Sequence, residues 1–278
     1  MNKRTIHRTA IVMFALVALA ACSTTTEEGT VGVHRSQLML VSSADLDKEA
    51  AAQYTQVIQT ESPKGNVNKD PQQAERVRNI AKRLIPQTAV FRKDALDWKW
   101  EVNVITSPEV NAWCMPGGKI AVYTGIIEKV HITDDELAAV MGHEISHALR
   151  EHGRERASQQ MAAGVGASLA GAVADIFLPG SGQLATAGAG AGAQLGVLLP
   201  YSRAHETEAD RMGVELAARA GYDPRAAVTL WQKMAKLSGA GAPPKLLSTH
   251  PSHEDRIKDL TEFSQKVMPL YEQARAKS

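Results

Sequence analysis

The sequence predicts an α+β chain that is mainly helical and carries a small β-sheet. Several segments place apolar residues at helical spacing between recognisable start and stop signals. Two short segments, 98–104 and 119–123, instead alternate apolar and polar residues, as half-buried strands do. No repeat of solenoid length is visible, and the chain length suits one domain. We therefore expect a single helical body built around a small sheet.

The helices can be placed from their end signals. Asp70 followed by Pro71 predicts a helix that ends near Pro86, because aspartate caps a helix and proline fits its first turn. Thr133 and Glu136 have the spacing of a capping box, in which each side chain bonds the other residue's backbone N–H. Three further helices are expected, from the segment at 201–210 to Gly221, from Asp223-Pro224 toward Leu237, and after Ser252.

The helix after Thr133 carries His143-Glu144-Ile145-Ser146-His147. A helix advances about 100° per residue, so the two histidines share a face one turn apart and are close enough to bind one metal ion. Glu144 is adjacent to the first histidine without being a ligand, which suits a general base that takes a proton from water. Buried histidines beside a carboxylate need partners, and a metal ion supplies one. The pattern therefore predicts a hydrolytic zinc site with His143 and His147 as ligands.

A catalytic zinc ion needs a third protein ligand and one open position. The best acidic candidates are Glu206 and Asp210, which share one face of a downstream helix. We expect Glu206 to bind the metal and Asp210 to accept the outward N–H of a ligating histidine. Glu208 is expected to point away as a solvated or structural acid. His152, about 180° from His143 on a continuous helix, is not expected to touch the metal.

Four sequence blocks together resemble peptidase family M48, a family of zinc metallopeptidases. They are H-E-x-x-H at 143–147, S-R-x-x-E-x-E-A-D at 202–210, N-A-W-x-x-P-G-G-x-I-x-V-x-x-G at 111–125 and T-H-P-x-x-x-x-R at 249–256. The resemblance implies a mainly helical, zincin-like metalloprotease fold with one Zn²⁺ per chain. It also implies that Glu206 is the third ligand and that the chain is an endopeptidase.

The block at 111–125 also has a mechanical interpretation. The Pro116-Gly117-Gly118 turn leads into the strand at 119–123, and an edge strand beside the metal can pair with an extended peptide through backbone hydrogen bonds. A hairpin that only fills the core is compatible with this interpretation. The residues expected to form the substrate strand are Asn111, Ala112, Trp113, Gly117 and Gly118.

His250 has two alternative roles. On a loop before a helix expected to be capped by Ser252, it could donate to the oxyanion of the tetrahedral intermediate, as a catalytic residue. It could instead occupy the open zinc position and keep the enzyme inactive. His205 and His253 are alternative donors, and a structural role is favoured for each.

The first residues predict a compartment. A basic start and a short apolar stretch precede Leu19-Ala20-Ala21-Cys22, which matches a bacterial lipobox, so residues 1–21 are expected to be a lipoprotein signal peptide and Cys22 the lipidated N-terminus. A plain secretory peptide is the alternative. Ser23, where an aspartate could stand, suggests sorting to the outer membrane of a Gram-negative bacterium, with the protein facing the periplasm.

Residues 22–36 are expected to be a flexible, lipid-anchored linker, and 37–278 the peptidase domain. Within it, the Gly/Ala-rich segment 161–200 predicts a helical hairpin that covers the cleft or leans on the membrane surface. Removal of the signal peptide leaves a slightly acidic chain, which gives no reason to expect nucleic acid. Cys114 is then the remaining ordinary thiol, so no internal disulfide is possible, and a small buried side chain is favoured over a redox role.

Two function classes follow from the sequence. The first is a zinc endopeptidase. The resemblance to family M48 implies misfolded or stalled envelope proteins as its substrates, and the outer-membrane assembly machinery is a candidate partner. The second is a chaperone-like factor that holds outer-membrane proteins during assembly while its proteolysis stays latent. The intact Glu144 favours the enzyme.

Overall fold

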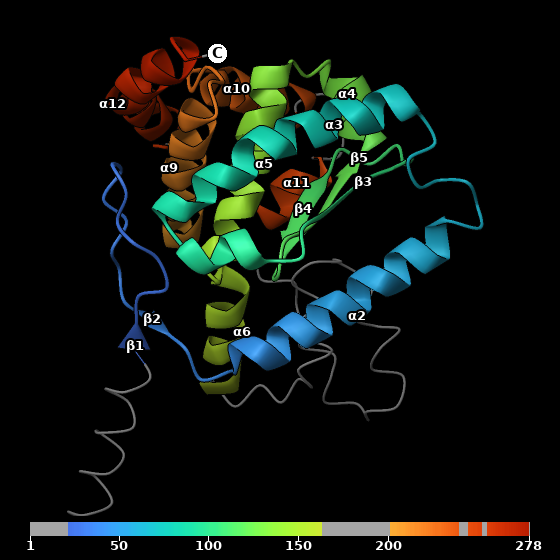
Figure 1. Cartoon of the computed structure of the whole chain (residues 1–278), viewed down its shortest axis with the longest axis horizontal. Coiled ribbons are helices and arrows are strands. Elements are labelled where there is room, and N and C mark those ends of the chain that lie inside the picture. Colours follow the sequence, from blue (N-terminus) through green and yellow to red (C-terminus); the bar gives the residue numbers. More distant parts are fainter. Residues whose placement is uncertain (1–21, 163–200, 239–243, 252–254, 278) are drawn as a thin grey trace, which may run out of the picture.

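The computed structural model describes residues 22–162, 201–238, 244–251 and 255–277. Its centre is the helix α5 (Asp134–Leu149), which packs against α9 (Arg203–Arg219), α10 (Ala226–Ser238), α3 (Pro71–Leu84) and the strand β4 (Ala112–Met115). Figure 1 shows α5 enclosed by these elements. Every residue of α5 from Glu136 to Leu149 is buried. The predicted α+β class, mainly helical with a small sheet, is confirmed.

The predicted capping box starts α5. The Oγ1 of Thr133 accepts a hydrogen bond from the backbone N of Glu136 at 3.2 Å, and the Glu136 carboxylate accepts one from the backbone N of Thr133 at 2.9 Å. Two otherwise unpaired N–H groups are thereby satisfied. The start of the helix fixes where His143 and His147 lie along it.

Two glycines bring α5 and α9 close together. A Cβ placed on Gly142 would lie 2.8 Å from the carbonyl oxygen of Gly213, and one on Gly213 would lie 2.8 Å from the backbone N of His143. Real Cβ atoms do not approach backbone atoms this closely. The crossing therefore requires glycine on both helices, and it sets α9 against the histidine face of α5.

The sheet has the strand order β3-β5-β4. β3 (Glu101–Ile105) runs parallel to β5 (Lys119–Tyr123), and β4 is antiparallel to β5 in a hairpin. The predicted turn joins β4 and β5, with φ of 73° at Gly117 and 80° at Gly118. A Cβ on Gly118 would also lie 2.6 Å from the ring of Trp100. The predicted strands are confirmed, but β3 starts at Glu101 and not at residue 98. The rings of Trp98 and Trp100, just before it, lie 5.4 Å apart and are inclined to each other by 31°.

The segment expected to be a flexible linker is packed instead. Strand β1 (Cys22–Ser23) pairs with β2 (Gln37–Leu38), and we call residues 22–41 the N-terminal hairpin. Val31 and Val33 join the main core. The buried Arg150 donates to Thr24 Oγ1 at 2.8 Å, and Thr25 Oγ1 donates to the carbonyl oxygen of Arg150 at 3.0 Å. These contacts outweigh the polar composition that predicted a linker. Figure 1 shows the N-terminal hairpin beside α9 and α6 (His152–Ala162).

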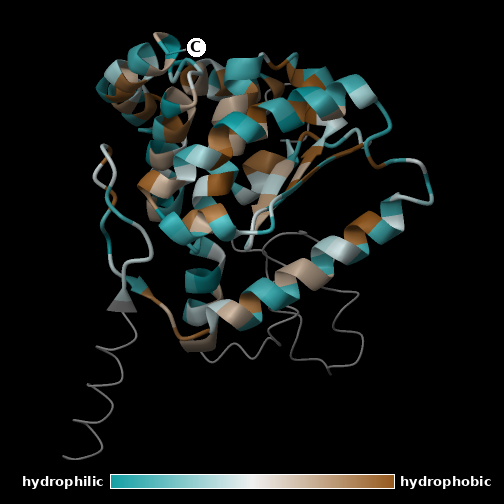
Figure 2. Ribbon diagram, in the orientation of Figure 1, coloured by the Kyte–Doolittle hydropathy of each residue, from teal (hydrophilic) through white to brown (hydrophobic). Residues whose placement is uncertain are grey.

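The remaining elements enclose the core. Hydrophilic and apolar residues are interspersed along α2 (Ser43–Glu61) in Figure 2. No helix in the described ranges is long and apolar enough to cross a membrane. The predicted signal peptide at 1–21 and nearly all of the predicted hairpin at 161–200 lie outside the described residues, as does Ser252. The other elements are α2 (Ser43–Glu61), the 3₁₀ helices η1 (Ile85–Val90) and η2 (Lys93–Asp97), α4 (Thr124–Val130), α6 (His152–Ala162), α11 (Lys245–Thr249) and α12 (Arg256–Arg275).

Candidate metal centre

Four side chains from three parts of the chain converge in the core. His143 and His147 come from α5, Glu206 from the first turn of α9, and His250 from the end of α11. One nitrogen or oxygen atom from each lies within 4.8 Å of the others, and all four residues are buried. The structure thus brings together the three residues predicted as ligands and adds His250 to them.

The contacts within this cluster are short. Nε2 of His147 lies 3.1 Å from Nε2 of His143, which in turn lies 3.2 Å from Nδ1 of His250. Oε1 of Glu206 lies 3.0 Å from Nδ1 of His250 and 3.4 Å from Nε2 of His147. Three imidazoles and one carboxylate therefore aim their inner atoms at a common point.

The cluster fits a zinc ion by the chemistry of its donors. Nδ1 of His143 is 2.9 Å from Oδ1 of Asp210, so this ring donates outward and keeps a lone pair on the inward Nε2. Oε2 of Glu206 is buried without a hydrogen bond, although it lies 3.1 Å from Nη1 of Arg256. Imidazole nitrogen and carboxylate oxygen are common zinc ligands. A cation at the common point would be a ligand partner for the inward nitrogens and for the Glu206 carboxylate, whose Oε2 forms no hydrogen bond.

Asp210 lies beside the outward nitrogen of His143, and a buried arginine holds it in place. Nε and Nη2 of Arg256 lie 2.8 Å from the two carboxylate oxygens of Asp210. Burial alone would raise the pKa of Asp210, but the positive charge of Arg256 and the hydrogen bond with His143 lower it below its usual value. The same balance, with His250 and His147 as partners, keeps the pKa of Glu206 well below its usual value. Both carboxylates are therefore ionised.

Glu144 lies at the edge of the cluster without joining it. Its Oε1 is 3.5 Å from Nε2 of His250 and has no hydrogen bond. Burial raises the pKa of Glu144, against the opposing effect of the nearby His250 and His143. A carboxylate whose pKa is raised toward neutrality is better suited to accept and release a proton.

Tyr201 and Arg256 contact the centre, and sequence reasoning gave neither a role. The Tyr201 ring lies 4.2 Å from that of His147 and 5.2 Å from that of His250, centroid to centroid. Arg256 is fully buried and stacks on Trp231 at 3.3 Å. The arginine was visible as the last letter of the T-H-P-x-x-x-x-R block. No local pattern pointed to the tyrosine.

One of the sequence-based placements is wrong, and another is narrowed to one of its two alternatives. His152 does not lie opposite His143 on a continuous helix, because α5 ends at Leu149 and Glu151 adopts a φ of +52° before α6 begins. His152 Nδ1 instead lies 3.0 Å from Nδ1 of His147, outside the four-residue cluster. Of the two alternatives for Glu208, a solvated or a structural acid, the structure fits the second: Glu208 is buried and accepts a hydrogen bond from Nε of Arg150 at 3.1 Å.

The other candidates lie around the centre. His205 is buried and its Nε2 lies 3.1 Å from Glu155, which fits the structural role favoured for it, while His253 is outside the described residues. Cys114 is buried in β4, and burial raises the pKa of its thiol well above the usual value, so its sulfur is not poised to react. The predicted substrate-strand residues lie in or beside the β4–β5 hairpin, whose strand β4 packs on α5.

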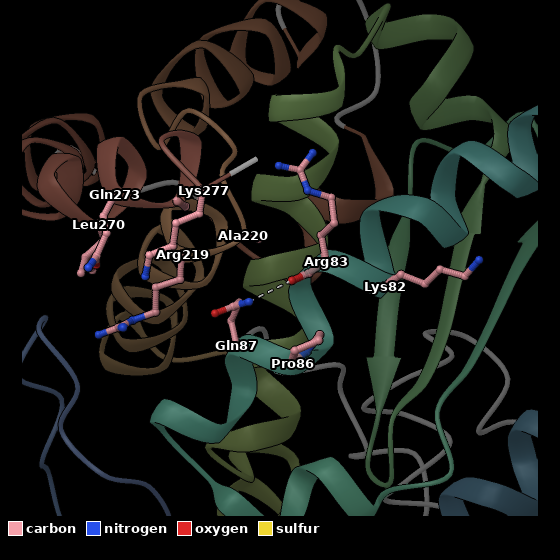
Figure 3. Close-up of a pocket in the computed structure, with 10 residues that line it drawn as sticks. Lys82, Arg83, Pro86, Gln87, Arg219, Ala220, Leu270, Gln273 and Lys277 are labelled. Atoms are coloured by element: carbon pink, nitrogen blue, oxygen red, sulfur yellow. Dashed lines mark hydrogen bonds between the residues drawn. The ribbon is translucent and has the colours of Figure 1, made fainter.

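A separate cavity is basic and shares no residue with the cluster. About 470 Å³ in volume, it lies where α3, α9 and α12 end, and Lys82, Arg83, Arg219 and Lys277 line it (Figure 3). Cations at helix C-termini balance the partial negative charge of the terminal carbonyl groups. Arg83 also donates to the carbonyl oxygen of Gly221 at 3.1 Å, and Arg219 pairs with Glu215 at 2.7 Å. These contacts give Arg83 and Arg219 a structural role.

The model of peptidase family M48 matches residues 71–264, which is more than half of the chain. This chain belongs to peptidase family M48. The mitochondrial metalloendopeptidase OMA1 of Schizosaccharomyces pombe is 38% identical over 188 residues, covering 67% of this chain and 52% of that protein. The protein of that name in Arabidopsis thaliana is 38% identical over 184 residues, covering 64% and 34%. The beta-barrel assembly-enhancing protease of Escherichia coli K12 is 28% identical over 211 residues, covering 74% and 42%.

The family model confirms the predicted membership of peptidase family M48, and the relatives are named as metalloendopeptidases or as a protease. The cluster of histidines and glutamate fits the predicted zinc cofactor. The chain spans about half the length of these relatives or less.

The expected location, at the outer membrane of a Gram-negative bacterium and facing the periplasm, is contradicted. The relatives from Schizosaccharomyces pombe, Arabidopsis thaliana and Bos taurus, at 37 to 38% identity, are named as mitochondrial, whereas the bacterial relative is 28% identical. The lipobox pattern at 19–22 is only four residues long and lies outside the region matched by the family model. This short pattern carries less weight than the sequence similarity to the mitochondrial relatives, which covers most of the chain.

Proposed function

We propose that this chain is a zinc endopeptidase that cleaves extended segments of misfolded or incompletely assembled membrane proteins. The observation that carries the proposal is the convergence of His143, His147 and Glu206 in a buried centre with the carboxylate of Glu144 at its edge. The name of the E. coli relative, which connects a protease with β-barrel assembly, supports this class of substrate.

In the proposed reaction, His143, His147 and Glu206 hold the zinc ion. When bound, zinc supplies Lewis acidity that makes water a better nucleophile and polarises the scissile carbonyl. Glu144 accepts the proton of the attacking water and passes it to the leaving amine, because its raised pKa favours both steps. Asp210 keeps the outward N–H of His143 occupied, so that the inward nitrogen remains a ligand.

The proposed substrate strand is β4. Within the described sheet, β4 pairs only with β5, so one of its edges is unpaired. An extended peptide on that edge would form backbone hydrogen bonds, with no demand on its sequence. Asn111, Ala112 and Trp113 would line it, while Gly117 and Gly118 make the tight turn at its end.

His250 is proposed to occupy the fourth position of the centre in this conformation. Its Nδ1 is 3.0 Å from Glu206 and 3.2 Å from His143, which is ligand spacing, and no donor site for an oxyanion is left on that nitrogen. In this conformation the fourth position is then closed to water, and displacement of His250 would open it. This choice favours the second of the two roles left open by the sequence.

The chaperone-like alternative has no structural observation of its own in its favour, and the buried, base-like Glu144 supports catalysis. Lipidation of Cys22 and contact with an assembly machinery stay predictions. The backbone of Cys22 is paired with Leu38 in the N-terminal hairpin.

The proposed activity is tested with purified protein and the variant Glu144→Gln. We expect one zinc per chain in both proteins by elemental analysis. We expect digestion of an unfolded protein such as casein by the wild type, at a rate about 10²-fold to 10⁴-fold above that of the variant. If the variant digests casein as fast as the wild type, Glu144 is not the general base. If neither protein binds zinc, the proposed centre is wrong.

A further inference from the structure

On the side facing away from the metal cluster, the ring of His147 contacts a second histidine, His152. Its Nδ1 lies 3.0 Å from Nδ1 of His152, and Nε2 of His152 lies 2.9 Å from Oε2 of Glu208 on α9. His152 has no exposed surface, and Glu208 is 8% exposed. The buried His152 therefore connects His147 to a carboxylate that is not part of the metal cluster.

The direction of hydrogen bonding from His147 through His152 to Glu208 follows from the groups at the two ends. An ionised carboxylate only accepts, so Nε2 of His152 donates to Glu208, and Nδ1 of the neutral ring accepts. His147 then donates from Nδ1 and keeps a lone pair on Nε2. That nitrogen is the one that lies 3.1 Å from His143 Nε2 and 3.4 Å from Glu206. The arrangement therefore selects the tautomer that a metal ligand requires.

The backbone break after α5 is what makes this contact possible. Glu151 adopts a left-handed φ of +52°, so α6 starts in a new direction and brings His152 back toward His147. The His152 ring also stacks on that of His205, with centroids 4.5 Å apart and planes inclined by 28°. The position of the His152 ring is thus fixed from two sides.

Glu208 is in turn held by two arginines. Arg150 donates from Nε to Oε2 at 3.1 Å, and Arg35 donates from Nε to Oε1 at 2.8 Å. Arg35 belongs to the N-terminal hairpin, which lies outside the residues matched by the family model. Asp210 and Arg256 form a comparable pair behind His143. Each of the two histidines is therefore backed by a carboxylate that an arginine holds.

We propose that His152 and Glu208 are positioning residues for His147, and that Arg35 makes the N-terminal hairpin part of the metal centre. The affinity for zinc then depends on a segment outside the family domain. This inference rests on the proposed role of His147 as a zinc ligand.

The test compares the zinc affinity of the full chain with that of the variants Glu208→Gln and Arg35→Gln, by competition with a chromophoric chelator. We expect Glu208→Gln to weaken zinc binding by about 10-fold to 100-fold, the range typical of residues that hold a metal ligand from behind. We expect Arg35→Gln to weaken it by a smaller factor, because Arg150 still pairs with Glu208. The visible spectrum of the Co²⁺-substituted protein is expected to change in Glu208→Gln.

Glu215→Gln is the matched control. Glu215 is a fully buried carboxylate on the same helix and also binds the N-terminal hairpin, through the backbone N of Val31 at 3.1 Å, but it makes no contact with the cluster. We expect it to lower the melting temperature of the zinc-free protein while leaving the zinc affinity within about twofold. Equal zinc affinities in the wild type and Glu208→Gln would overturn the inference, as would an equal loss in Glu215→Gln. Failure of the wild type to bind zinc would instead refute the proposed function.

Discussion

Gly142 of α5 and Gly213 of α9 face each other at a helix crossing so close that neither position has room for a methyl group. Gly142 directly precedes His143, and Gly213 lies two turns after Glu206 on its helix. The pair therefore sets the spacing of the two helices that supply three members of the metal cluster. Its effect on the centre is geometric, because neither glycine has a side chain to offer.

Gly213→Ala is expected to push α9 away from α5. The added methyl would lie 2.8 Å from the backbone N of His143, a clash that only a shift of the helices can relieve. Overpacking of this kind costs about 1–3 kcal/mol of unfolding free energy. We also expect weaker zinc binding, because Glu206 moves with its helix. Chemical denaturation and zinc titration measure the two effects. Met212→Leu is the control, because it replaces a buried side chain next to Gly213 by one of similar volume. If Gly213→Ala binds zinc as tightly as Met212→Leu does, the argument is wrong.

His250→Ala is expected to raise peptidase activity and to weaken zinc binding at the same time. The ring occupies the fourth position of the cluster, so its removal opens that position and also deletes one ligand. Casein digestion and zinc titration, both at saturating and at limiting zinc, separate the two effects. His34→Ala, at an exposed histidine, is the control. A large loss of activity in His250→Ala with zinc fully bound would show that His250 assists catalysis instead.

The sequence was informative where function needs a fixed local spacing. His143, Glu144 and His147 form one helical turn, the capping box that starts α5 is local, and Glu206 and Asp210 are again one turn apart. Spacing along the sequence does not tell how close the turn with His143 and His147 lies to the turn with Glu206 and Asp210. The resemblance of the four sequence blocks to a known family is what indicates that these turns meet.

The errors arose where a local rule was overridden by tertiary contacts. His152 was placed by extending α5, and the left-handed backbone of Glu151 ends that helix. The polar composition of the N-terminal hairpin predicts a linker, yet the hairpin is held against the core by a hydrogen bond from Arg150 to a threonine hydroxyl. Arg256 is a residue whose environment the sequence does not reveal. A single arginine in a motif gives no sign that it is fully buried between two carboxylates.

Arg256→Met is expected to destabilise the zinc-free protein strongly. The arginine is the buried cation that Glu206 and Asp210 share, and breaking such a pair leaves charge uncompensated at a cost of about 3–5 kcal/mol. Zinc should restore part of this loss, because the metal compensates Glu206. Chemical denaturation with and without zinc measures both. Arg211→Met removes a partly exposed pair with Asp259 and should cost about 0–1 kcal/mol. A similar, small cost for Arg256→Met would refute the argument.

The ionised carboxylate of Glu155 should make the free energy of unfolding depend on pH. Burial opposes ionisation of this carboxyl group, but hydrogen bonds from Arg35, His205 and Gln37 lower its pKa to about 2. The pKa of an unfolded glutamate is about 4.3, so the stabilisation is fully present above that pH and is lost as the pH falls toward 2. We expect Glu155→Gln to be less stable than the wild type at neutral pH, by on the order of 2 kcal/mol.

The pH dependence separates this effect from a simple packing defect. As the pH falls from about 5 to 2, the free energies of unfolding of the wild type and Glu155→Gln should converge, because the wild type loses its advantage. Glu75→Gln, at an exposed glutamate, should follow the wild type at every pH. Urea denaturation at a series of pH values measures all three proteins. A gap between the wild type and Glu155→Gln that stays constant down to pH 2 would mean that the ionised carboxylate contributes nothing, and that only the shape of the side chain matters.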